Sequence, residues 1–71
     1  MQIATNIKTL REQKGISQEE LAKLSGLSRS AIAKIETGWQ FPSFESGLRI
    51  ARALDTTCEE LAYGKAEQPK I

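Results

Sequence analysis

The chain has 71 residues, of which 39% are hydrophobic and 27% charged, and this composition is typical of one small globular domain spanning residues 1–71. Ten Lys and Arg residues against nine Asp and Glu residues give a net charge of +1, so a surface that binds an anion must be a local feature. One cysteine excludes an internal disulfide, the absence of histidine argues against a structural zinc site, and no apolar stretch approaches the roughly 20 residues of a membrane span. We therefore expect a cytoplasmic protein with no metal, no cofactor, no signal peptide and no membrane segment.

Two short helices are predicted in the first third of the chain. Apolar residues at i, i+4 and i+7 predict an amphipathic helix from residue 3 that ends at Gly15. These apolar residues are Ile3, Ile7 and Leu10. A capping box of Ser17 and Glu20 starts the second helix, and Gly26 ends it.

The third predicted helix lies between the cap Ser28 and the stop Gly38, and it has only two large apolar residues, Ile32 and Ile35. These two isoleucines define its buried side. A helix in the middle of a small domain that has so little to bury is expected to have a function on its other side.

The outward side of the third helix is small and polar. At ~100° steps, Ser30 and Thr37 point away from the two isoleucines, and Ala33 and Lys34 flank them. Arg29 lies on the rim at the first turn. Small side chains allow a close approach to another surface, and the two cations at the edges indicate that this surface is anionic.

Two further helices complete the predicted fold. Pro42 and Ser43 mark the start of the fourth, and a second capping box of Thr57 and Glu60 opens the fifth, which closes at Gly64. The fourth helix has a broad apolar face, made of Phe44, Gly47, Leu48, Ile50, Ala51 and Leu54. Valine is absent and no segment alternates with period two, so we expect an all-α fold of five short helices with a core over about 3–63 and a loose polar tail, 65–71.

The second and third helices form a predicted helix-turn-helix. The turn between them is short and contains Gly26, for which a left-handed backbone is accessible, and Ala22 is small enough for two helices to cross closely. Arg11 follows Ile7 by four residues and so faces inward, where a cation needs a partner. Glu36, beside Ile35, is the candidate partner; the alternative is that both side chains reach solvent.

The run ISQEELAKLSGLSRSAIAKIETG, with LREQKG before it and PSFESGLRIARALDTTCEEL after it, closely resembles the Cro and phage-repressor type of helix-turn-helix domain, the XRE family. The resemblance covers roughly residues 3–63. It implies a lambda-repressor-like fold that binds the major groove of double-stranded DNA as a homodimer.

The resemblance also implies roles for individual residues. Positions that contact base edges are Arg29, Ser30 and Lys34. Positions that contact the DNA backbone are Gln18, Ser28, Thr37 and Gln40. Gln18 would in addition brace the third helix, and Arg11 and Glu36 match a buried ion pair.

The sequence departs from the family at Trp39-Gln40-Phe41, where many members have Lys or Arg just after the glycine. Trp39 and Phe41 either contact a protein or fold back onto the core. Leu61 and Tyr63 are either core residues or part of a dimer seam, for which Trp39 and Phe41 are the other candidates. Cys58, at the first turn of the last helix, is either a redox-sensitive thiolate or a small packed side chain.

We expect a sequence-specific DNA-binding transcriptional regulator, a repressor or autoregulator that binds a pseudo-palindromic operator as a dimer. It would be encoded by a bacterium or phage, associate with the nucleoid and have no room for a separate effector domain. The alternative is an antitoxin or adaptor with the same fold and a protein partner. An enzyme is not expected, because no histidine or other base accompanies any serine.

Overall fold

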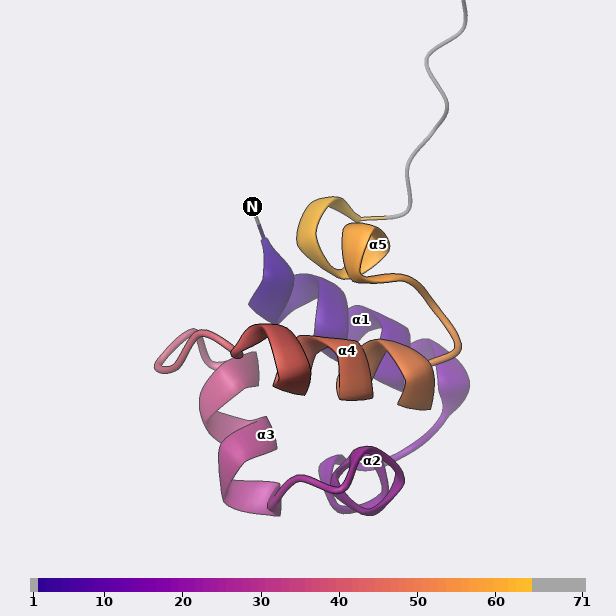
Figure 1. Ribbon diagram of the computed structural model, residues 1–71. Coiled ribbons are helices and arrows are strands. Elements are labelled where there is room, and N and C mark those ends of the chain that lie inside the picture. The colour runs from indigo at the N-terminus through magenta and orange to yellow at the C-terminus, as the bar shows by residue number, and fades with distance from the viewer. Residues whose placement is uncertain (1, 65–71) are drawn as a thin grey trace, which may run out of the picture.

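The computed structural model describes residues 2–64, and these residues form five helices and no strand. The helices are α1 (Ile3–Lys14), α2 (Gln18–Ser25), α3 (Arg29–Glu36), α4 (Phe44–Ala53) and α5 (Cys58–Tyr63), shown in Figure 1. The all-α fold of five short helices expected from the sequence is confirmed. The expectation of a loose tail at 65–71 lies outside the described residues. None of the helices in this range is long and apolar enough to cross a membrane.

Side-chain caps begin four of the five helices, as the sequence indicates. At α2 the predicted capping box is complete: the Ser17 hydroxyl accepts from the Glu20 amide, and the Glu20 carboxylate accepts from the Ser17 amide. At α5 the prediction of a second box is wrong in one half. Thr57 accepts from the Glu60 amide, but the Glu60 carboxylate accepts from the hydroxyl of Thr56 instead of the Thr57 amide.

All five helices contribute to one small core. The buried hydrophobic residues are Ile7, Leu21, Ala22, Ile32, Ile35, Ile50, Ala51, Leu54 and Leu61. Helix α2 packs against α3 and α4, while α1 packs against α3 and α5 (Figure 1). Helices α1 and α2 therefore support α3 from its inner side. Among the described residues, no other helix packs extensively against α3.

The predicted apolar face of α4 is buried only in part. Gly47, Ile50, Ala51 and Leu54 are buried and Leu48 is half-buried, but Phe44 is 81% exposed. The expectation that Phe44 belongs to the buried face is wrong, because its side chain lines an open groove with residues of α1 and α5 and does not pack into the core.

Candidate nucleic-acid interface

The turn between α2 and α3 fixes how the outward helix is presented. Gly26 adopts a left-handed conformation with φ 75°, which other residues rarely adopt, and the Leu27 amide donates to the Ala22 carbonyl at 3.1 Å. The Ser28 hydroxyl then accepts from the Ala31 amide and starts α3 two residues after the glycine. The two helices meet through this short turn and pack on each other, which is the predicted helix-turn-helix.

The outer face of α3 has the composition that the sequence predicts. Ile32 and Ile35 are buried, whereas Arg29, Ser30 and Lys34 are exposed. Thr37, the C-terminal cap, is also exposed. The structure thus brings the three expected base-reading side chains together as exposed residues of one helix.

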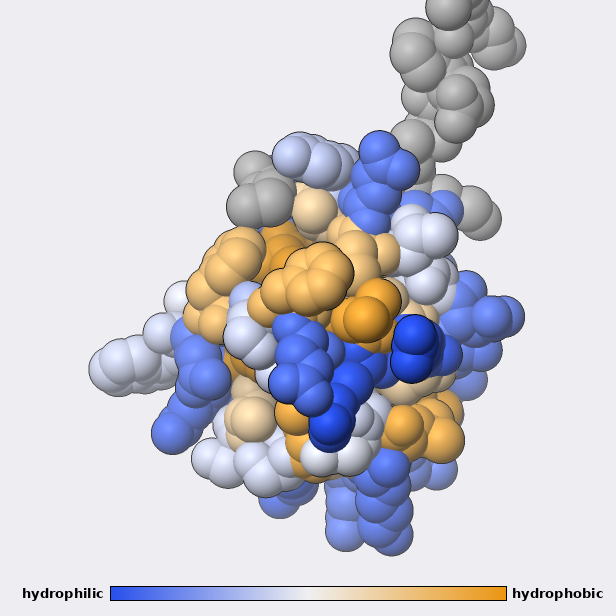
Figure 2. Space-filling view, in the orientation of Figure 1, coloured by the Kyte–Doolittle hydropathy of each residue, from blue (hydrophilic) through white to orange (hydrophobic). Residues whose placement is uncertain are grey.

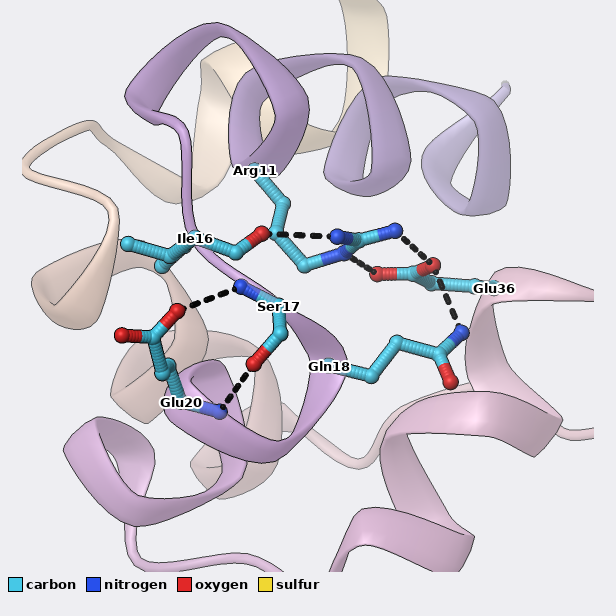
Figure 3. A network of polar contacts seen from close by, with 6 residues as sticks. All are labelled: Arg11, Ile16, Ser17, Gln18, Glu20 and Glu36. Atoms are coloured by element: carbon cyan, nitrogen blue, oxygen red, sulfur yellow. Dashed lines mark hydrogen bonds and ion pairs between the residues drawn. The ribbon is translucent and has the colours of Figure 1, made fainter.

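The predicted Arg11–Glu36 pair is present and is the most buried charged contact among residues 2–64 (Figure 3). Arg11 Nε donates to Glu36 Oε2 at 2.7 Å and Arg11 Nη2 donates to Glu36 Oε1 at 3.1 Å. The side chains are only 11% and 2% exposed, so the alternative in which both reach solvent is wrong. The hydrogen bond to Glu36 raises the pKa of Arg11, against a smaller opposing effect of burial.

Two further groups complete this network. Arg11 Nη1 donates to the Ile16 carbonyl at 2.8 Å, and Gln18 Nε2 donates to Glu36 Oε1 at 3.0 Å. Figure 3 shows the side chains converging from α1, α2 and α3. The first residue of α2 is thereby tied to the last residue of α3, so the start of one helix and the end of the other keep a fixed relation.

The segment after α3 is closed by backbone hydrogen bonds. Gly38 is left-handed with φ 81°, its amide donates to the Ile35 carbonyl, and the amides of Trp39 and Gln40 both donate to the Lys34 carbonyl at 3.0 and 3.2 Å. The Thr37 hydroxyl donates to the same Lys34 oxygen at 3.0 Å. Trp39 is 84% exposed and Phe41 is 63% exposed. The alternative in which these two rings fold back onto the core is therefore wrong.

A second surface lies where the end of this segment meets α1, α4 and α5. It is an open groove of about 310 Å³, lined mainly by Ile3, Phe41, Pro42, Phe44, Cys58 and Ala62. Figure 2 shows hydrophobic side chains gathered over this part of the molecule. Sequence reasoning missed Ile3, Phe44 and Ala62, because helical periodicity assigned the first two to the core and gave Ala62 no role.

The remaining candidates divide clearly by burial. Leu61 has no exposed surface and belongs to the core, which corrects its place among the seam candidates, whereas Tyr63 is exposed. Cys58 is half-buried in the wall of the groove and is not in a disulfide. Among the described residues, no group of three acidic, cysteine or histidine side chains is arranged as metal ligands would be.

Comparisons with known proteins agree on the fold and on the kind of protein. A family model described as helix-turn-helix matches residues 7–61. The chain is 40% identical over 59 residues to the HTH-type transcriptional regulator AnsR of Bacillus subtilis, covering 83% of this chain and 50% of AnsR. The chain thus spans only half the length of that relative.

Two solved structures are similar over most of the chain. The restriction-modification controller protein C.AhdI from Aeromonas hydrophila superposes with a TM-score of 0.82 at 42% identity, covering 84% of this chain and 91% of C.AhdI. The P22 c2 repressor in complex with synthetic operator 9T superposes with a TM-score of 0.85 at 28% identity, covering 92% of this chain and 98% of the repressor. The five helices are therefore those of a lambda-repressor-like helix-turn-helix domain.

Proposed function

This chain belongs to the helix-turn-helix family, of the Cro and phage-repressor (XRE) type, and we propose that it is a sequence-specific DNA-binding transcriptional regulator. The observation that carries the proposal is the outer face of α3, which is small, polar and cationic and is held by a buried network at its end. AnsR is a transcriptional regulator, and the P22 c2 repressor binds an operator, which supports the same activity here.

In this proposal α3 lies in the major groove and its exposed side chains read the bases. Arg29, in the first turn, is suited to the O6 and N7 acceptors of guanine, and Lys34 reaches a base one turn later. Ser30 lies beside Arg29 and supplies a hydroxyl that both donates and accepts. The small side chains between the two cations let the helix approach the base edges.

Four side chains at the ends of α2 and α3 are proposed to hold phosphates and so fix the register. Gln18, Ser28 and Gln40 carry hydrogen-bond donors that the contacts described above leave able to donate. The fourth, Thr37, donates its hydroxyl proton to the Lys34 carbonyl. A phosphate contact by Thr37 therefore requires its side chain to rotate away from that carbonyl.

We further propose that the protein binds a pseudo-palindromic operator as a two-fold dimer and represses transcription there. One recognition helix reads only a few base pairs, which is too few to select a site in a genome. Two copies related by two-fold symmetry place their helices roughly 34–36 Å apart, one turn of DNA.

The apolar groove is the proposed seam of the dimer, with Phe41 and Phe44 as its anchors. Tyr63 is exposed and follows the lining residue Ala62 in the chain. Burying the exposed parts of both rings removes on the order of 300 Å² from each subunit, a gross gain of about 15 kcal/mol per dimer. Association costs about 4–15 kcal/mol, so this seam supports only a weak dimer in the absence of DNA. Binding of both subunits to one operator would stabilise that dimer. Trp39 does not line the groove and is not part of the proposed seam.

The experiment that tests DNA recognition is selection of bound duplexes from a random pool, followed by footprinting. On the selected site, Arg29→Ala should cost about 1–3 kcal/mol of binding free energy and relax discrimination at one base pair. Arg52→Ala is the control of equal charge, because Arg52 lies in the last turn of α4, at the end of that helix away from α3 (Figure 1). A pool without any enriched sequence would contradict the proposal.

Sedimentation equilibrium tests the dimer, without DNA and on half-site and full-site duplexes. Phe44→Ser should weaken association on the full site, whereas Leu24→Ser, which changes an exposed hydrophobic residue outside the groove, should not. The dimer is wrong if the wild type binds a lone half-site as tightly as the full site and is a monomer on both.

The exposed rings of Trp39, Phe41 and Phe44 also favour a second candidate, an antitoxin or adaptor that binds a protein through the same fold. Under this alternative a neighbouring gene product co-purifies with the chain, and its binding is lost in Phe44→Ser but retained in Arg29→Ala.

A further inference from the structure

We infer that Trp39 contacts the DNA backbone at the edge of the major groove, with its ring against the sugar and its Nε1–H donated to a phosphate. This contact would act together with the Gln40 amide and without any positive charge. The inference rests on the proposed function, because it takes α3 as the helix in the groove.

The first support is the position of Trp39, which is fixed relative to α3. The Trp39 amide donates to the Lys34 carbonyl at 3.0 Å, and the left-handed Gly38 completes this closure of the helix. A helix of 8 residues, as α3 is, has a length of roughly 12 Å, about the width of the major groove. When the exposed side chains of α3 read base edges, the segment just past its C-terminal end lies at the groove edge, where the phosphates are.

The second support is the exposure of the side chain. Trp39 is 84% exposed, the highest value among the large hydrophobic residues of 2–64. It contributes nothing to the core and does not line the apolar groove of Phe41 and Phe44. In Figure 1 the segment between α3 and α4 projects from the side of the bundle. An indole held outward in this way has an apolar ring and one hydrogen-bond donor to offer to a partner.

The third support is the shortage of other donors at this place. No Lys or Arg stands between Lys34 and Arg49 in the sequence. The amides of Gly38, Trp39 and Gln40 are all donated to carbonyls of α3, and so is the Thr37 hydroxyl. Within residues 37–40, the donors that can reach a phosphate without breaking one of these hydrogen bonds are the Trp39 indole and the Gln40 side-chain amide, and both are neutral.

A neutral contact has a distinct signature in salt. The salt dependence of DNA binding counts the phosphates that Lys and Arg neutralise, because these release counterions. A Trp39 contact therefore adds affinity at every salt concentration and leaves the slope of log K against log salt unchanged. Replacing the indole by a cation at the same place should make the slope steeper.

The experiment uses the full chain and the duplex obtained by selection, with affinity read from the anisotropy of labelled DNA across a salt series. Trp39→Ala should weaken binding about ten-fold per half-site, as for loss of one hydrogen bond to a charged group, with an unchanged slope. Trp39→Phe, which keeps a ring but has no donor, should bind with an affinity between those of the wild type and Trp39→Ala. Trp39→Arg should steepen the slope by about 0.9 for each subunit. Leu24→Ala, which truncates another exposed hydrophobic residue, should bind as the wild type does.

A second readout comes from the fluorescence of the wild type, because Trp39 is the single tryptophan of the chain. DNA should shift its emission and protect it from acrylamide, a neutral quencher. The inference is overturned if the wild type binds DNA while Trp39→Ala binds equally well and quenching is unchanged. It is also overturned if Trp39→Ala weakens only self-association in sedimentation and leaves half-site affinity intact. Failure of the wild type to bind any duplex would instead overturn the proposed function.

Discussion

Arg11→Met should remove a large share of the stability of the domain. Methionine retains the length and the apolar stem of arginine but takes away two of the three donors to the Glu36 carboxylate. That carboxylate is 2% exposed and would retain only Gln18. Breaking a buried pair in this way costs about 3–5 kcal/mol. The free energy of unfolding of a 71-residue domain is about 4–10 kcal/mol, so the variant should lose roughly half of its stability or more.

Urea denaturation followed by circular dichroism measures this loss, with the double variant Arg11→Met/Glu36→Leu completing the cycle. Since the double variant leaves no charge buried without a partner, it should be more stable than Arg11→Met alone. Arg49→Met is the matched control, because Arg49 and Glu45 are paired at 2.9 Å but are 48% and 74% exposed. Its cost should stay below about 1 kcal/mol. Small and additive effects at Arg11 and Glu36 would refute the coupling.

The same pair should contribute no pH dependence near neutrality. The hydrogen bond to Glu36 raises the pKa of Arg11 in the folded state. A raised pKa gives stability that is present below the unfolded value and is lost as pH rises through the folded value. Arginine titrates far above neutral pH in both states. The difference in free energy of unfolding between the wild type and Arg11→Met/Glu36→Leu, which lacks the pair, should therefore be flat between about pH 6 and 9.

Three further outcomes are expected. Gly26→Ala should destabilise the domain by about 1–2 kcal/mol in urea, because φ is 75° there; the new methyl would lie 3.2 Å from the end of the flexible Arg49 side chain, which can move. Ser17→Ala should cost about 1 kcal/mol through loss of the cap of α2, and Ser17→Gly should cost less. Specific DNA binding by the wild type should weaken as salt rises, by about 0.9 in slope for each neutralised phosphate, and a flat response would contradict DNA binding.

The buried network shows what sequence alone can reach. The sequence predicts that Arg11 faces inward because it follows Ile7 by one helical turn, and it predicts Glu36 as the partner because a buried cation needs an anion. The third contact of Arg11, to the Ile16 carbonyl, was not predicted, because every residue has a carbonyl and no residue type marks that one. The family resemblance implies that Gln18 braces the third helix, but it does not identify Glu36 as the residue to which Gln18 donates.

The errors at the ends of α4 and α5 have a common cause. The period of a helix tells which residues share a side, but not how far neighbouring helices extend along that side. Phe44 is in phase with buried residues and is nevertheless exposed, because the neighbouring α1 and α5 leave an open groove beside it. Likewise Glu60 has the spacing of a capping box with Thr57, yet its carboxylate accepts a hydrogen bond from the adjacent Thr56 hydroxyl instead of the Thr57 amide. Such choices depend on tertiary packing, which local patterns do not contain.

The small positive charge of the chain is consistent with selective rather than strong DNA binding. Non-specific affinity comes almost entirely from the cations that meet phosphates. The proposed face has only Arg29 and Lys34 from each subunit, and both are proposed to read bases. Competition from the rest of a genome is set by the ratio of specific to non-specific affinity. A face that adds neutral contacts from Trp39 and Gln40 raises specific binding only where α3 is fully seated, because those contacts form at the groove edge. Such a face gains discrimination without the non-specific affinity that additional lysines would bring.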